Sequence, residues 1–187
     1  MNGPFDTDEL LRIHTGFKLQ IELVPNGCWY TNVRSNVTKK QWDIIRKDAY
    51  RKAGYHCEIC GGVGARHPVE CHEVWSYDIP TTIQKLEKLE ALCPLCHEVK
   101  HFGFASERGF RKRALTRFAK INGICLEEAE EIIHAVFQQW EERSLLNWTL
   151  DITLLKKYGI SSNKENKSEN NPDSDYPNGF FNRLTTI

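Results

Sequence analysis

The sequence predicts an α+β fold, and three observations support this fold class. Apolar and polar residues alternate over 17–24, and a Pro-Asn-Gly turn then leads into 28–33, which indicates an N-terminal β-hairpin. Apolar residues three or four apart indicate helices before residue 54 and after residue 109. Between them, two Cys-x-x-Cys pairs enclose 32 residues, enough for a further hairpin with a loop. The 187 residues suffice for one such core with appendages.

The first helix is expected from Lys39 to Ala53. Thr38 suits the N-cap position, apolar residues recur on one face, and Gly54 ends the pattern. We therefore expect residues 1–38 to form an N-terminal β-hairpin region. The core, residues 39–105, then begins with this basic helix.

Inside the core, residues 68–75 are expected to be extended and to carry His72. The apolar residues of Ile83–Leu92 lie three apart, which favours a helix, or a loop followed by a helix. The polar residues that follow Cys96 favour another short helix.

Two helices, at about 110–121 and 126–143, are expected to form a C-terminal extension over residues 106–159. A last short strand is expected from Trp148 to Leu154. From residue 160 to 187 the chain is rich in Ser, Asn, Glu, Lys and Asp, which predicts a disordered tail.

Four cysteines have the spacing of a structural zinc site, namely Cys57, Cys60, Cys93 and Cys96. A two-residue spacer lets both sulfurs of each pair reach one ion at about 2.3 Å, and two such pairs complete a tetrahedral zinc site. A site closed by four thiolates holds structure and leaves no position for a reactant.

Three histidines are candidates for a second metal site. His97 and His101 are four residues apart, so on a helix they project from one face and can reach the same ion. His72 lies on the insert whose ends the cysteine pairs hold. Imidazole ligands, unlike four thiolates, leave positions open for water or phosphate.

The run from Val69 to Val74 (Val-Glu-Cys-His-Glu-Val), followed by the run from Leu92 to His101 (Leu-Cys-Pro-Leu-Cys-His-Glu-Val-Lys-His), resembles the HNH, or ββα-metal, nucleases in their four-cysteine form. The resemblance covers about a quarter of the chain. It implies a hairpin and a helix around one divalent ion, with a strand residue that activates water against a phosphodiester of DNA; RNA is less expected for this family.

Two readings of the strand follow from the resemblance. His72 is either the general base, with Cys71 at the ligand position, or a metal ligand, with Glu73 at the base position. His97 and His101 are the remaining ligands of a catalytic Mg²⁺, or of Mn²⁺, Ni²⁺ or Zn²⁺. The family's central Asn is absent, because Lys88 occupies its place in the simplest alignment.

Charge is distributed unevenly in a chain whose net charge is zero. Residues 39–56 carry six basic side chains against two acidic ones, and residues 98–120 carry seven against two. Each segment is either an ordinary solvated face or a phosphate-binding face. If the second segment binds phosphate, we expect the contacts from Lys100, Arg111, Lys112 and Arg113.

The sequence contains no apolar run of the roughly 20 residues that a membrane helix needs, and metal-type cysteine spacing suits a reducing compartment. We therefore expect a cytoplasmic protein without a membrane partner. The resemblance predicts an endonuclease. The alternative is a zinc module that binds nucleic acid without cutting it, which has no need for His72, His97 and His101 to converge.

Overall fold

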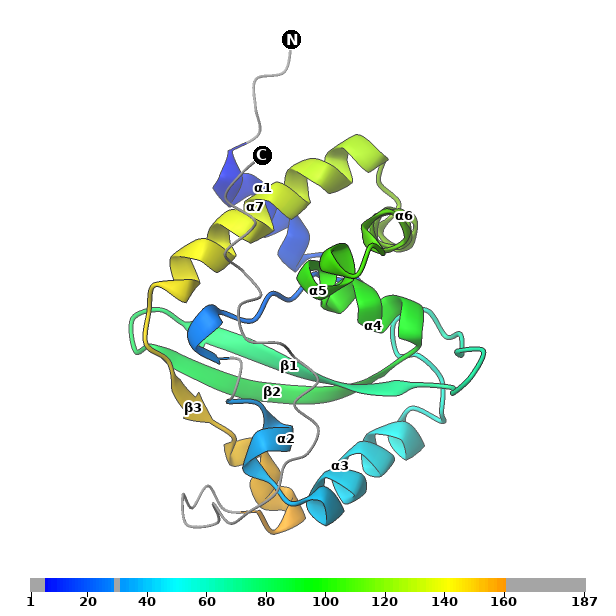
Figure 1. Ribbon diagram of the computed structural model, residues 1–187, viewed down its shortest axis with the longest axis vertical. Coiled ribbons are helices and arrows are strands. Elements are labelled where there is room, and N and C mark those ends of the chain that lie inside the picture. The colour runs from blue at the N-terminus through cyan, green and yellow to red at the C-terminus, as the bar shows by residue number, and fades with distance from the viewer. Residues whose placement is uncertain (1–5, 29–30, 161–187) are drawn as a thin grey trace.

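Helices cover both faces of a small three-stranded sheet (Figure 1). The structure is a computed structural model that describes residues 6–28 and 31–160. Helices α1, α4, α5, α6 and α7 lie on one side of the sheet, and α2, α3 and the 3-10 helix η2 lie on the other (Figure 1). The mixed α+β class is confirmed. No helix in the described ranges is both long enough and apolar enough to span a bilayer.

The sheet has the order β1-β2-β3. β1 (Glu70–Asp78) pairs antiparallel with β2 (Ile83–Leu92), and the register shifts between Val74 and Trp75. β3 (Thr149–Asp151) pairs parallel with β2. The extended segment expected at 68–75 is confirmed from Glu70 onward. The strand expected at 148–154 is confirmed only for Thr149–Asp151, because η2 begins at Thr153.

The helix expected over 83–92 is wrong, because this segment is the central strand β2. Its side chains alternate between buried Gln84 and Leu86 and exposed Lys85 and Glu87. The alternation is difficult to recognise in the sequence because a polar residue, Gln84, takes an inward position.

The predicted N-terminal hairpin is also wrong within the described residues. The chain forms α1 (Thr7–Thr15), an irregular segment, η1 (Asn26–Cys28) and α2 (Val33–Asn36). Leu19 and Ile21 are buried, as the alternation predicted, but no strand pairs with their backbone. Instead, the N–H of Leu19 donates to the Asn122 side chain and the N–H of Ile21 donates to His14.

The helix α3 (Lys39–Lys52) confirms the expectation for residues 39–53. Thr38 caps it, and the Gln41 side chain returns a bond to the backbone of Thr38, which satisfies two terminal N–H groups. Ile45 and Ala49 face the sheet and are buried. The sheet thus separates α3 from the helices of the opposite layer (Figure 1).

The C-terminal helices agree with the expected ones. After α4 (Pro94–Lys100) and α5 (Phe102–Glu107) come α6 (Arg111–Asn122), α7 (Leu126–Ser144) and η2 (Thr153–Tyr158). Two apolar clusters fill the spaces on the two sides of the sheet. The predicted disordered tail lies outside the described residues except for Ile160, which is buried.

Candidate metal centre

Four cysteine sulfurs form one cluster. Two come from the segment that follows α3, and two come from the start of α4. Cys93 occupies the N-cap of α4, so Cys96 lies in its first turn. The Sγ atoms of Cys60 and Cys93 are 3.7 Å apart, and all four sulfurs lie within 4.8 Å of one another. Ligands 2.3 Å from one ion at tetrahedral angles lie about 3.8 Å apart. The predicted cluster therefore fits a structural zinc ion.

The protonation chemistry of the cluster suits a dication. A hydrogen bond from Cys96 lowers the pKa of Cys57 to about 4, while the same bond raises the pKa of Cys96. Burial raises the pKa of Cys93. Without a cation, the thiols thus cannot all ionise together. A divalent cation would stabilise all four as thiolates, which is the form that it binds. Arg117 of α6 adds positive charge, since its guanidinium donates to Cys96 Sγ at 3.3 Å.

Three imidazoles form a second cluster, as the sequence predicted. His72 projects from β1, while His97 lies within α4 and His101 is its C-cap, one helical turn further on. The ligand atoms of the three rings lie within 4.8 Å of one another. The Nε2 atoms of His97 and His101 are 3.2 Å apart. Nitrogens 2.0–2.1 Å from one tetrahedral ion lie about 3.3 Å apart, so this spacing also fits a metal.

Carboxylates hold the outer nitrogens of two rings. Glu22 Oε2 is 2.9 Å from His72 Nε2, and Glu70 Oε2 is 2.5 Å from His97 Nδ1. A carboxylate only accepts, so each bond fixes a proton on the outer nitrogen and leaves a lone pair on the inner one. His72 Nδ1 is buried and has no hydrogen-bond partner among the described residues. Metal-binding histidines are usually supported in this way.

Burial keeps two of the imidazoles, His72 and His101, in the form that binds metal. It lowers the pKa of His72, and it lowers the pKa of His101 well below the ordinary value, helped by the neighbouring imidazoles. Neutral imidazole is the ligand form. His72 is 3% exposed and His97 is 21% exposed, so solvent reaches the cluster on the His97 side.

A buried charge network supports His72 from behind. Burial opposes ionisation of Glu22, but the hydrogen bond to His72 and the charge of Lys100 lower its pKa to about 2. Lys100 Nζ lies 2.5 Å from Glu22 and 3.6 Å from Glu90. Lys100 is 4% exposed. Its ammonium is therefore enclosed and paired, which corrects the predicted phosphate contact of Lys100.

Glu73 does not belong to the cluster. It follows His72 on the strand and so projects from the opposite face of the sheet. Its Oε2 accepts the backbone N–H of Val33 at 3.0 Å, and burial raises its pKa to about 7. This position corrects the predicted catalytic role of Glu73, because its carboxylate is turned away from the imidazoles.

The predicted phosphate-binding residues of α6 are largely paired. Arg111 binds Glu130 through two hydrogen bonds, and Arg113 binds Glu98 in the same way. Lys112 is exposed and has no ion pair in residues 6–28 and 31–160. Carboxylates from other elements thus neutralise two of the three basic side chains.

Sequence reasoning missed two supporting residues, Glu22 and Glu70. Glu70 stands two positions before His72, so strand alternation places both on one face and was a usable signal. Glu22 lies 50 residues before His72, in a segment whose pattern indicated a different structure. No local spacing connects them.

Comparison with known proteins adds no assignment. No family model, no curated protein and no solved structure matches this chain. The functional argument therefore rests on the geometry of the two clusters.

Proposed function

We propose that this chain is a metal-dependent HNH endonuclease that hydrolyses phosphodiester bonds in DNA. One observation carries the proposal: His72, His97 and His101 offer ligand atoms within 4.8 Å of one another, beside a separate cluster of four sulfurs. The order of the elements supports it, because two antiparallel strands are followed directly by α4, which supplies His97 and, at its C-cap, His101. This order is the one that the family resemblance implies.

The two clusters take different roles. The four cysteines hold a structural zinc, which fixes the start of α4 relative to the hairpin. The three imidazoles would hold a second divalent ion, and their nitrogen donors favour Zn²⁺ or Ni²⁺ over Mg²⁺ and Mn²⁺, which prefer oxygen ligands. Such an ion, when bound, polarises a phosphoryl oxygen and stabilises the leaving oxygen.

The geometry favours His72 as a ligand over His72 as the base. Its Nε2 proton is held by Glu22, and its lone pair is at the inward Nδ1. With Glu73 turned away, the base role passes to His67. His67 is half exposed, and its Nε2 lies 2.6 Å from Glu70. The proton held on Nε2 leaves Nδ1 of His67 free to accept a proton from water.

A second candidate is the zinc module that binds nucleic acid without hydrolysis. The burial of His72 favours it, because a metal enclosed by the protein has fewer open positions for water and phosphate. The two candidates share the four-cysteine site and differ in what the imidazoles do.

Plasmid nicking separates the two functions. His97→Ala is expected to abolish nicking in the presence of Zn²⁺, Ni²⁺ or Mn²⁺, while one equivalent of zinc and the affinity for DNA remain. His134→Ala, an exposed position on α7, is the matched control and is expected to cut normally. Undiminished nicking by the His97 variant would reject the proposed nuclease site. Absence of nicking by the wild-type protein would favour the module that binds nucleic acid without hydrolysis.

The same assay tests the base. His67→Gln is expected to slow nicking about 100-fold, within the range for loss of a general base, while metal stoichiometry stays unchanged. Wild-type rates in that variant reject His67 as the base without affecting the metal assignment.

A further inference from the structure

A basic groove runs along the outer side of α3. Two open hollows lie against this helix, and they share Ile44 and Lys47, so they form one continuous depression. The second hollow extends onto η2 through Lys157 and Tyr158. We propose that this groove, from here called the α3 groove, binds the phosphate backbone of a nucleic acid. The proposal concerns binding alone and stands whether or not the chain hydrolyses DNA.

Charge is the first argument. The α3 groove contains two carboxylates, Asp43 and Asp48, and six cationic side chains, a net of four positive charges in a chain that is neutral as a whole. Those cationic residues are Lys39, Lys40, Lys47, Arg51, Lys52 and Lys157.

The pairing pattern is the second argument. Asp43 pairs with Arg46, and Asp48 pairs with Arg51 and Lys52. Lys39, Lys40 and Lys47 are exposed and make no ion pair within the described part of the chain. They differ in this from Arg111 and Arg113 of α6, which carboxylates neutralise.

The position of two lysines is the third argument. The first turn of α3 contains Lys39 and Lys40 and no acidic residue. Cations there oppose the helix dipole, whose N-terminal end is positive, so the arrangement costs stability. The first turns of α1 and α7 carry acidic residues, whereas the basic first turn of α6 is neutralised at Arg111 and Arg113 by carboxylates. Lys40 makes no ion pair within the described residues, so an external anion would offset its cost.

The dimensions suit a polymer of phosphates. Lys40 and Lys47 are two helical turns apart and so lie on one face of α3. A helix of 14 residues is about 21 Å long, a length of B-DNA that carries about a dozen phosphates. The depression is open along its length and does not form an enclosed small-molecule pocket.

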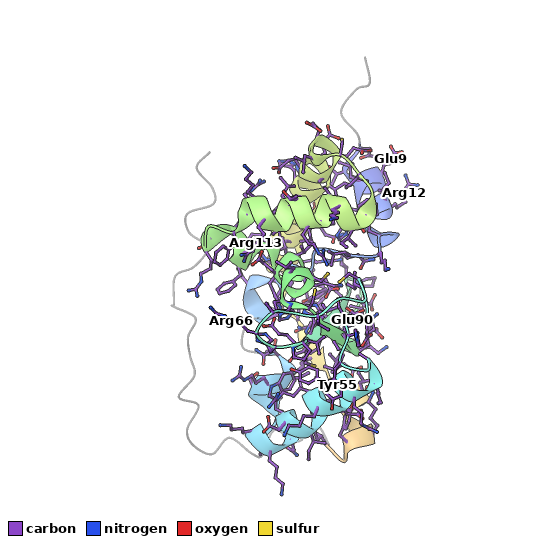
Figure 2. The ribbon with its side chains drawn as sticks, turned by 90° about the vertical axis from the view of Figure 1, so that its right-hand side faces the viewer. Glu9, Arg12, Tyr55, Arg66, Glu90 and Arg113 are labelled. Carbon is purple, nitrogen blue, oxygen red and sulfur yellow. The ribbon has the colours of Figure 1, made fainter. Side chains whose placement is uncertain are left out.

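Exposed apolar side chains stand among the charges. Ile44 is 54% exposed and Tyr55 is 53% exposed, and both line the α3 groove. Figure 2 shows Tyr55 beyond the end of α3, below the loop that carries Arg66. Sugars and bases offer such side chains a surface beside the phosphates. Two apolar residues are too few for the continuous apolar face with which a helix enters a membrane.

Paired charge reversals test the assignment. Lys40→Glu with Lys47→Glu changes the α3 groove, and Lys18→Glu with Lys120→Glu is the control of equal charge change outside it. All four lysines are exposed, and neither control residue lines the α3 groove. The full-length zinc-containing proteins are titrated into a fluorescein-labelled 20-base-pair duplex without added divalent ions, and anisotropy is followed from 50 to 300 mM KCl.

The α3 variant is expected to bind at least about tenfold more weakly at 100 mM KCl, and the slope of log K against log salt is expected to fall by about 2. The Lys18/Lys120 variant is expected to stay within about twofold of wild type. Circular dichroism and zinc content verify that both variants are folded. Unchanged affinity in the α3 variant overturns the proposal, as does an equal loss in both. It is also overturned if the wild-type protein binds phosphatidylserine vesicles or polyglutamate but not the duplex.

Discussion

Replacing Glu22 by Gln tests whether the buried carboxylate orients His72 for a metal. Glu22 is 20% exposed and accepts from both His72 and Lys100. Gln has nearly the same shape and keeps an oxygen that can accept the His72 proton. The substitution therefore removes mainly the negative charge, which increases the basicity of the inward nitrogen of His72.

The size of the effect follows from the contacts that each variant retains. Loss of a carboxylate behind a metal-binding histidine typically costs 10–100-fold in metal affinity, or about 1.4–2.7 kcal/mol. Glu22→Gln keeps one acceptor, so we expect about a tenfold loss. Glu22→Ala keeps none and leaves Lys100 with Glu90 alone at 3.6 Å, so we expect about a hundredfold loss.

The assay is a calorimetric titration of Ni²⁺ into protein that already holds one equivalent of zinc. Glu90→Gln is the control, because Glu90 belongs to the same buried network but contacts Lys100 and Lys88, with no bond to His72. We expect its Ni²⁺ affinity to stay within about threefold of wild type. Equal losses in the Glu22 and Glu90 variants would show a general disturbance of the interior, and no loss in Glu22→Ala would refute the orienting role.

Two further predictions concern stability. Burial lowers the pKa of His14 from 6.5 to about 4, and its Nε2 accepts the N–H of Ile21. The unfolded chain therefore takes the proton first as pH falls below 6.5. Wild-type protein should lose about 3 kcal/mol more unfolding free energy than His14→Gln between pH 7 and pH 4 in urea titrations, and parallel losses would contradict this. Lys40→Glu should raise the melting temperature by about 2 °C, because it removes a cation from the positive end of α3, whereas Lys47→Glu in mid-helix should leave it unchanged. A lower melting temperature for Lys40→Glu would contradict the cost assigned to that lysine.

The sequence predicts well where local spacing determines the structure. Thr38 and Gln41 specify the start of α3 within a few residues of each other, so the helix is recognisable without its tertiary partners. The same holds for the cysteine pairs and for His97 and His101, because a turn or a helix fixes their separation. Placing His72 in the same cluster as His97 and His101 required only the assumption that both cysteine pairs bind one zinc ion.

Long-range contacts account for the errors. The segment at 17–24 alternates like a strand, yet its N–H groups bond to His14, to Asn122 and to the carbonyl of Lys100. Those partners come from three different helices or helix ends. No window of the sequence contains both a donor of this segment and its acceptor from α4 or α6, so the alternation alone could not distinguish a paired strand from a buried irregular segment.

The two misassigned segments have a feature in common that bears on function. One carries Glu22, and the other, β2, carries Glu90; both carboxylates lie beside the buried ammonium of Lys100. Burying charged groups is costly even when they are paired, so a fold selected for stability alone gains little from this arrangement. Its effect is to fix an ionised carboxylate against His72. On the proposed function, the departure from the expected sequence pattern and the support of the imidazole cluster have one cause, since local rules are broken where a site requires particular polar groups in the interior.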